Sequence, residues 1–509
     1  MSTPKQKKFY ITTPIYYANA KPHIGHAYTT VAADVLARFH KLQNEKVFFL
    51  TGLDEHGLKI QRIAEKTGKN PQEFVDGISE EFKNLWKKLN IQYDSFIRTT
   101  DQKHKKAVQE ALQGLYEKGS IYKGTYEGLY CVGCEQYKTK NDLVDGKCSD
   151  HNMEPELLKE ESYLLKTADL QAKLIKKIED DEFKIAPEKY KKEILSFLNG
   201  QELKDISISR KNVRWGIPLP FDNQYTAYVW MDAFLNYLTG INWDGSENIP
   251  DLFPPEVQLI GKDILRVHAT MWPAVLMHLG ADLPRTLFTH GHILAGGKKM
   301  SKTLGNVIDP NDMIKKFGAD ATRYLLMSAG TFGEDVDLTM ERAAEIYQAD
   351  LANGLGNLAA RVLAMAEKTK SEKLKTKNNN PGFEVKIKNA WLDYYKFINN
   401  FKLNEALEMT RRFMSTCDEY VEKNKPWQME GGEKAKTIYN LLESLRHITW
   451  MIKPFIPETS DKIFTQLFAD EKERAAELSK TLAEAQKWGG MKSCAKTKKG
   501  ENLFPRLKI

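Results

Sequence analysis

The first fifty residues of the chain contain the pattern that most restricts its fold. Residues Phe9 to Thr12 form an apolar and aromatic run typical of a buried strand. After a loop with proline and asparagine, apolar side chains recur at every fourth position, which indicates a helix with a buried face at Ala27, Val31, Val35 and Phe39. Val47 to Leu50 is a second apolar run. Strand, helix and strand in this order predict a parallel βαβ unit.

Two later segments extend this pattern. Val257 to Ile260 and Leu287 to Thr289 have the composition of strands, and each is followed by a polar or glycine-containing loop. Open parallel sheets bind ligands beyond the carboxyl ends of their strands. From Glu341 onward glycine becomes rare and helical patterns such as Ile438 to Met451 take over, interrupted by a connection at Lys368 to Gly382. We therefore expect an α/β fold with a Rossmann-like parallel sheet, followed by an all-α helical bundle.

Composition limits the class of protein. The 509-residue chain has no stretch close to the roughly 20 apolar residues of a membrane helix. Its first ten residues, MSTPKQKKFY, lack the apolar core of a signal peptide, so we predict a cytoplasmic protein. Five cysteines in so long a chain do not form a disulfide scaffold, and we expect the isolated Cys417 and Cys494 to be inert. The net charge of +7 is compatible with an RNA partner but indicates one only weakly.

A candidate phosphate-binding motif lies at the junction of the first strand and helix. It reads His23-Ile24-Gly25-His26. A helix N-terminus has unpaired backbone N–H groups and a positive dipole end, so it attracts phosphate. Gly25 lets a nucleotide approach the backbone closely, and both histidines can donate to phosphate oxygens. On its own this motif is weak, because two histidines near a glycine also occur by chance.

A second motif strengthens the first. Lys299-Met300-Ser301-Lys302-Thr303 follows Gly296-Gly297 in a loop that could close over a triphosphate, although alone it would be taken for a solvated basic loop. In this order the two motifs resemble the paired signatures of class I aminoacyl-tRNA synthetases, with Thr303 where the family usually has serine. The resemblance implies that the carboxylate of an amino acid attacks the α-phosphate of ATP, which is accompanied by Mg²⁺. It assigns the catalytic roles to His23, His26, Lys299 and Lys302.

Several strings over about 260 residues resemble the methionyl-tRNA synthetase family within class I. They are Thr12 to Tyr17, Thr51 to Gly57, Trp215 to Pro218, Tyr228 to Ala233, and Gly261 to Ile264 leading to His268 and Trp272. The resemblance implies binding of ATP by His23, Gly25, His26, Gly261, Asp263 and Lys302. It implies binding of L-methionine by Ile15, Tyr17, Asp54, Trp230, Ala233, Tyr237, Ile264 and His268. In this set Asp54 would bind the ammonium group of the substrate. Taken alone, Tyr237 or Ile264 would be interpreted as a core residue.

Cysteine spacing predicts a metal site. Cys131 and Cys134 form one pair, and Cys148 and His151 form a second after a gap of 13 residues. Such spacing is typical of zinc, and a closed Cys3His set is expected for structural zinc with one ion per chain. The alternative is four unrelated surface residues. Methionyl enzymes carry a zinc knuckle at this place, often with four cysteines, which makes His151 the least certain ligand.

The helical region offers candidate contacts to tRNA. Asn357 and Arg361 lie one helical turn apart. Pro426 should end or kink the helix before it and leave Trp427 at the edge, although a tryptophan is more often a core residue. Both strings resemble anticodon-reading positions of methionyl enzymes, which implies tRNA(Met) as the partner. Because the chain ends soon after this region, at Leu503 to Arg506, we expect a monomer.

The expected organisation has five parts. Residues 1–118 and 215–297 are the two halves of the Rossmann catalytic domain, and 119–214 is a connective insertion with the zinc knuckle. Residues 298–345 hold the lysine loop and a stem-contact region, and 346–509 form the helical anticodon-binding domain. Two alternatives stay open. One is a class I synthetase for another amino acid, such as cysteine; the other is a non-catalytic RNA-binding paralogue, which would usually lose one of the two signatures.

Overall fold

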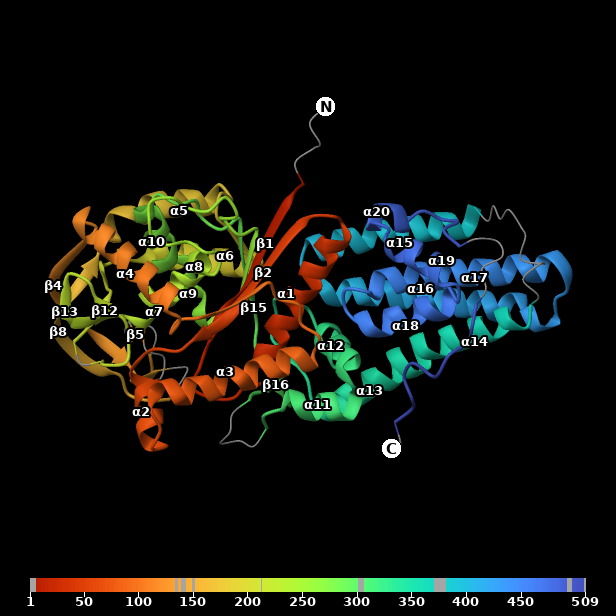
Figure 1. Cartoon of the computed structure of the whole chain (residues 1–509), viewed down its shortest axis with the longest axis horizontal. Helices are drawn as coiled ribbons and strands as arrows, with labels where there is room; N and C mark the ends of the chain where they lie inside the picture. The colour runs from red at the N-terminus through yellow and green to blue at the C-terminus, as the bar shows by residue number, and fades with distance from the viewer. Residues whose placement is uncertain are drawn as a thin grey trace, which may run out of the picture.

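The chain folds into an α/β body that contains the N-terminal residues and a helical body that contains most of the C-terminal third (Figure 1). The computed structural model describes residues 6–132, 136–138, 143–148, 152–211, 213–300, 306–369, 381–491 and 497–507. Within this part of the chain no helix is both long and apolar enough to cross a membrane.

The α/β body is built on a parallel sheet of six strands in the order β3-β2-β1-β14-β15-β9. The strands are β1 (Lys8–Tyr17), β2 (Lys46–Asp54), β3 (Ser95–Arg98), β9 (Lys184–Ala186), β14 (Val257–Gly261) and β15 (Thr286–His290). The four strands predicted from the sequence are therefore confirmed as β1, β2, β14 and β15. The order reverses between β1 and β14, and a ligand cleft forms at such a switch point.

Helix α1 (Ile24–Leu42) connects β1 to β2 and begins at the carboxyl end of β1. Its four predicted core residues have at most 1% of their surface exposed: Ala27, Val31, Val35 and Phe39. Apolar side chains on the other sides of α1 are buried too, because α1 packs on the sheet and on α12 (Ala319–Ser328). This burial fixes the N-terminus of α1 against the sheet.

Further helices complete the α/β body. They are α2 (Leu58–Lys66), α3 (Pro71–Lys88), α4 (Gln102–Glu117), α5 (Gln171–Glu179), α6 (Glu188–Gly200), α7 (Val229–Phe234), α8 (Asn236–Thr239), α9 (Leu265–Ala269), α10 (Met271–Leu279) and α11 (Pro310–Phe317). Short 3-10 turns lie at η2 (Ala168–Leu170) and η3 (Lys262–Ile264).

The range 119–214 contributes both to a separate sheet and to the main one. Strands β4 (Ile121–Cys131), β5 (Gln136–Lys138), β8 (Glu156–Leu165) and β10 (Ile206–Ser207) form an antiparallel sheet, next to the hairpin of β6 (Leu143–Val144) and β7 (Lys147–Cys148). Strands β11 (Ser209–Arg210), β12 (Pro218–Leu219) and β13 (Asp222–Ala227) form another small sheet. Strand β9 instead returns to the edge of the parallel sheet beside β15. One strand of the range predicted as an insertion, β9, therefore belongs to the main sheet.

The segment that leads into Lys299 to Thr303, here called the lysine loop, lies on another small sheet. It contains β16 (Ile293–Ala295), β17 (Lys298–Lys299) and β18 (Val336–Asp337). Gly296 and Gly297, both with positive φ, form the turn between β16 and β17. The backbone N–H of Gly297 donates to the Asp337 carboxylate at 3.0 Å, so β18 supports this turn.

The helical body follows. Helix α13 (Met340–Ile346) continues through the π-helical segment η4 (Tyr347–Gly356) into α14 (Asn357–Glu367). The other helices are α15 (Pro381–Asn399), α16 (Leu403–Asn424), α17 (Gly431–Ile452), α18 (Pro457–Leu467), α19 (Glu471–Leu478) and α20 (Leu482–Ala485), with a 3-10 turn at η6 (Pro426–Gln428). A helical C-terminal region is thereby confirmed. Most of the predicted connection at Lys368 to Gly382 lies outside the described residues.

Candidate active site

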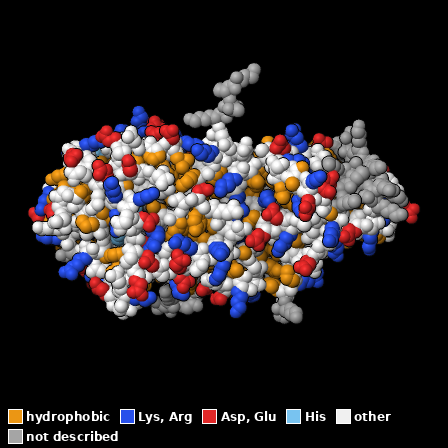
Figure 2. Space-filling view, in the orientation of Figure 1, with side chains coloured by type: hydrophobic (Ala, Val, Ile, Leu, Met, Phe, Trp, Pro, Cys, Tyr) orange, Lys and Arg blue, Asp and Glu red, His pale blue; other side chains and the backbone are white. Residues whose placement is uncertain are grey.

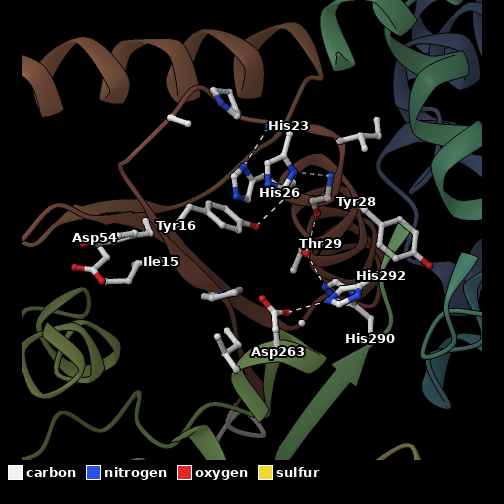
Figure 3. Close-up of a pocket in the computed structure, with 18 of the residues that line it drawn as sticks. Ile15, Tyr16, His23, His26, Tyr28, Thr29, Asp54, Asp263, His290 and His292 are labelled. Atoms are coloured by element: carbon white, nitrogen blue, oxygen red, sulfur yellow. Dashed lines mark hydrogen bonds and ion pairs between the residues drawn. The ribbon is translucent and has the colours of Figure 1, made fainter. Parts of the chain in front are cut away.

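A cavity of about 790 Å³ opens at the carboxyl ends of β1 and β14, where the strand order reverses. Its walls come from the end of β1, the start of α1, helices α7 to α9, and the segment after β15. In Figure 3, Ile15 and Asp54 lie on one side of this cavity. The other side holds Asp263 and four labelled histidines: His23, His26, His290 and His292. We call these sides the Asp54 end and the histidine end.

At the histidine end, His23 and His26 cap the N-terminus of α1. The Nδ1 atom of His23 accepts the backbone N–H of Gly25 at 3.1 Å, and the Nδ1 atom of His26 accepts the backbone N–H of His23 at 3.2 Å. Their rings stack with centroids 3.7 Å apart. Because each Nδ1 accepts a hydrogen bond, the proton of each neutral ring is on Nε2.

Both rings are therefore suited to donate hydrogen bonds. Burial, together with the neighbouring His23, lowers the pKa of His26 well below its usual value, so this ring is neutral at pH 7. Two Nε2–H groups beside a helix N-terminus favour a phosphate ligand. Gly25 packs closely on the His23 ring, because a Cβ at this position would lie 3.0 Å from that ring.

Asp263 is a carboxylate of the histidine end. Burial raises its pKa, but the hydrogen bond and charge of His292 outweigh this and hold the pKa well below its usual range. The His292 Nε2 atom lies 3.5 Å from Asp263 Oδ1, and about half of the Asp263 side chain stays accessible. At Gly261 a Cβ would lie 2.8 Å from the same carboxylate oxygen. Gly261 therefore leaves room for Asp263 to accept hydrogen bonds from a ligand.

The Asp54 end is mostly apolar and aromatic. The structure brings all eight residues predicted for methionine to this one cavity: Ile15, Tyr17, Asp54, Trp230, Ala233, Tyr237, Ile264 and His268. Tyr237 donates from its hydroxyl to His268 Nε2 at 2.9 Å, because His268 Nδ1 donates to the Ile264 carbonyl at 2.9 Å. Burial lowers the pKa of His268 to about 4, so its ring is neutral at pH 7.

Buried hydrogen bonds hold two walls of the Asp54 end together. Asp232, between Trp230 and Ala233 on α7, accepts from His56 Nδ1 at 2.6 Å and from His104 Nε2 at 2.7 Å. His56 follows closely after Asp54 at the end of β2. Trp215 contacts the same segment after β2, because its indole N–H donates to the Glu55 carbonyl at 2.5 Å. The carboxylate of Asp54 and the aromatic wall of α7 are thus fixed relative to each other.

The lysine loop is only partly described. Lys299 and Met300 line the cavity, whereas Lys302 and Thr303 lie outside the described residues. Lys299 is exposed at the end of β17.

Sequence reasoning missed several residues of the cavity. His290 ends β15 and His292 follows it, Thr29 lies on α1, and Asn236 begins α8. His290 Nε2 lies 2.7 Å from the hydroxyl of Thr29 (Figure 3). The buried amide oxygen of Asn236 has no hydrogen-bond partner among the described residues. The string His290-Gly291-His292 at the end of a predicted strand was a usable signal, since ligands bind beyond strand ends.

Two of the four predicted zinc ligands are described. Cys131 ends β4 and Cys148 lies on β7, and both are buried. Cys134 and His151 lie outside the described residues. Within the described ranges, no three His, Cys, Asp or Glu side chains are grouped to hold a metal ion.

The predicted tRNA contacts lie on the helical body. Asn357 is exposed at the start of α14, whereas Arg361 pairs with Asp418 at 3.2 Å and Glu422 at 2.6 Å on α16. Helix α16 ends at Asn424, as the position of Pro426 predicts, and the following Trp427 is 54% exposed. Figure 2 shows basic and acidic side chains mixed over one face of the molecule, so charge alone does not mark an RNA surface on it.

Comparison with known families gives two matches. Residues 9–153 and 134–363 match the family described as tRNA synthetases class I (M). Residues 383–500 match the family described as anticodon-binding domain of tRNA ligase.

Individual relatives are similar along nearly the whole chain. The methionine–tRNA ligase of Caldanaerobacter subterraneus subsp. tengcongensis is 41% identical, covering 99% of this chain and 80% of that protein. The methionine–tRNA ligase of Streptomyces coelicolor is 40% identical, covering 98% of this chain and 97% of that protein. The solved structure of Mycobacterium tuberculosis methionyl-tRNA synthetase in complex with methionyl-adenylate is 32% identical with a TM-score of 0.89, covering 98% of this chain and 100% of that chain.

Proposed function

The chain belongs to the methionine–tRNA ligases of the class I tRNA synthetase family, and we propose how its own residues perform the reaction of that family. It activates L-methionine with ATP to methionyl-adenylate and pyrophosphate, and then transfers methionine to the 3′-terminal adenosine of tRNA(Met). One observation carries the assignment of the site. A single cavity joins an aromatic pocket with one carboxylate to a histidine pair at a helix N-terminus.

Methionine binds at the Asp54 end. The thioether is flexible and polarizable and packs well against aromatic edges, which Trp230 and Tyr237 supply. His268 is neutral there, so it adds no charge beside an uncharged side chain. The carboxylate of Asp54 holds the substrate ammonium and thereby aims the substrate carboxylate toward the histidine end.

ATP binds at the histidine end. The Nε2–H groups of His23 and His26 donate to phosphate oxygens at the N-terminus of α1. Asp263, beside Gly261, accepts hydrogen bonds from the ribose hydroxyls. Lys299 at the end of β17 and Lys302 in the loop after it approach the triphosphate, and Mg²⁺ bound with ATP would neutralise part of its charge.

The activation step needs no protein nucleophile. An oxygen of the methionine carboxylate forms a bond to the α-phosphorus, and the bond from that phosphorus to the pyrophosphate oxygen breaks. Catalysis is then the positioning of two substrates and the stabilisation of charge on the phosphoryl oxygens. In the second step a ribose hydroxyl of the tRNA attacks the activated carbonyl, and AMP leaves.

A structural zinc ion fits the insertion. Cys131 at the end of β4 and Cys148 on β7 are buried, and Cys148 follows Lys147 after a turn at Asp145 and Gly146, both with positive φ. Cysteine thiolates are the usual ligands of structural zinc in proteins. We propose Cys134 and His151 as the other two ligands. The ion would hold the insertion in shape and take no part in the reaction.

The helical body reads the anticodon in our proposal. Trp427 offers an exposed ring on which an unstacked base can lie. Arg361 already pairs with two carboxylates, so it would have to exchange one of them for a base, whereas Asn357 is exposed. We further propose a monomeric cytoplasmic enzyme with the five-part organisation given above.

ATP–pyrophosphate exchange with each of the twenty amino acids tests the function. We expect methionine to support exchange roughly 100-fold better than any other amino acid. Exchange with cysteine instead would support the cysteinyl alternative, and RNA binding without any exchange would support the non-catalytic alternative. The variant Asp54→Asn should raise the KM for methionine, whereas the control Asp169→Asn, at an exposed site outside the cavity, should not.

A further inference from the structure

The turn between α15 and α16 places a phenylalanine where helices usually end with glycine. The backbone N–H groups of Phe401 and Lys402 donate to the carbonyls of Ile398 and Phe397 at 3.0 and 2.9 Å. This is the Schellman pattern, in which the left-handed position is usually glycine. Phe401 occupies that position with φ of 60°. A bulky residue in this region is strained, so its ring must be held by contacts elsewhere.

The ring of Phe401 contacts the α/β body. Its centroid lies 4.5 Å from that of Phe288 on β15. Phe288 stacks on Phe332 at 5.0 Å with the ring planes 5° apart, and Phe332 stacks on His290 at 5.7 Å. These four rings, which we call the aromatic column, run from the helical body to the cavity.

The last ring of the column is held in one orientation. His290 Nδ1 lies 2.7 Å from the Gly291 carbonyl and Nε2 lies 2.7 Å from the Thr29 hydroxyl. The ring of Tyr28 meets both His290 and Phe332 edge to face, at 5.4 and 5.3 Å. His290, Thr29 and Tyr28 all line the cavity. A shift of Phe332 would therefore move groups at the histidine end.

The loop that carries Phe332 is also fixed to the segment after β15. A Cβ at Gly291 would lie 2.4 Å from the backbone of Glu334 and Asp335, so the two segments touch directly. The backbone N–H of His292 donates to the Asp335 carboxylate at 2.8 Å. His292 in turn lies beside Asp263. The column and this loop thus connect Phe401 to the charged group of the histidine end.

We propose that Phe401 is a positioning residue for ATP binding, and that its ring transmits the placement of the helical body to His290 and its neighbours. Phe401 touches no substrate, and the proposal rests on the assignment of the histidine end to ATP. Its strained backbone sets the direction in which the ring points, so the contact with Phe288 depends on where the α15–α16 turn sits.

Three variants test the proposal. Phe401→Gly removes the ring and relaxes the left-handed backbone, so the relief of strain offsets part of the stability that is lost with the ring contacts. We expect its KM for ATP in pyrophosphate exchange to rise about threefold to tenfold while the KM for methionine is unchanged. Phe401→Tyr keeps the ring and should restore the wild-type KM for ATP. Tyr395→Leu removes another aromatic contact between the two bodies, with Phe39 at 5.7 Å, and should change neither KM.

A second readout does not depend on catalysis. Hydrogen exchange of the backbone amides in residues 286–292 should be faster in Phe401→Gly than in the wild type or in Tyr395→Leu. An unchanged KM for ATP in Phe401→Gly, or an equal rise in both KM values with a lower melting temperature, would overturn the proposal. If the wild type shows no methionine-dependent exchange, the proposed function fails instead, and the hydrogen-exchange comparison still decides whether the column couples the two bodies.

Discussion

Asp34 on α1 and Arg323 on α12 form an ion pair of 2.7 Å in which neither side chain is exposed. Arg323 also donates to the carbonyls of Leu89, Pro454 and Phe455 at 3.1, 2.9 and 2.7 Å. One guanidinium thus joins the helix that carries His23 and His26 to the loop between α17 and α18 in the helical body. The α/β body and the helical body are therefore joined near the middle of α1.

Arg323→Met should lower the free energy of unfolding by about 3–5 kcal/mol, because it removes one of the two guanidinium partners of the buried Asp34 carboxylate and the donor to three carbonyls, whereas Arg38 stays at 2.6 Å from Asp34. Urea denaturation measures this loss. The control Arg342→Met removes an exposed pair with Glu345 and should cost less than about 1 kcal/mol. Equal losses in the two variants would contradict the role assigned to the buried pair.

His268 should make stability depend on pH. Burial lowers its pKa to about 4 in the folded state, whereas an unfolded histidine titrates near 6.5. Between these values the unfolded chain binds more protons, so stability is complete above pH 6.5 and falls as the pH is lowered toward 4. At pH 5 the loss should be on the order of 2 kcal/mol. His268→Gln should lose less stability than the wild type between pH 7 and pH 5, and identical slopes would argue against a buried neutral ring.

Lys302→Ala should slow formation of methionyl-adenylate on the order of 100- to 1,000-fold, because the side chain would no longer stabilise charge on the departing pyrophosphate. Binding of methionine without ATP should hardly change. Rapid-quench measurement of the first turnover separates the two effects. Activation within threefold of the wild-type rate would show that Lys302 has another role.

Elemental analysis of protein prepared without chelator should find one zinc ion per chain, and Cys131→Ser should lose it. Because the proposed metal would orient the insertion, and Cys131 and Cys148 do not line the cavity, charging of tRNA should suffer more than pyrophosphate exchange. Cys417→Ser is the matched control, since burial raises the pKa of this isolated thiol on α16 to about 12. Absence of metal from the wild type would reject the site. Full zinc affinity in His151→Ala would reject only the fourth ligand.

Trp427→Ala should weaken charging of tRNA(Met) by roughly ten- to 150-fold, because stacking on an aromatic ring contributes about 1–3 kcal/mol per base. Pyrophosphate exchange needs no tRNA and should stay near normal. Trp427→Phe should keep most of the charging activity, whereas Asn357→Ala or Arg361→Ala should narrow the preference for the CAU anticodon. Equal damage to both activities, with a lower melting temperature, would make Trp427 a structural residue.

Local patterns predicted much of the fold. Strands β1, β2, β14 and β15 contain short apolar runs with the composition of strands, and helix α1 has apolar side chains at every fourth position, so these local patterns located them. Strand β9 could not be found in this way, because Lys184–Ala186 is too short to show a period and joins the sheet only by pairing with β15.

The candidate site, too, was predicted from the sequence only in part. The sequence by itself determined the family resemblance, the residues of the Asp54 end, and the histidine pair, because those residues lie in contiguous strings at the ends of predicted elements. Only the tertiary structure decided that His290 meets Thr29, which is 261 positions away, that two carboxylates occupy Arg361, and that the Phe401 ring reaches Phe288. The physical reason is that these contacts join segments far apart in the chain, and no local period encodes which distant surfaces pack together.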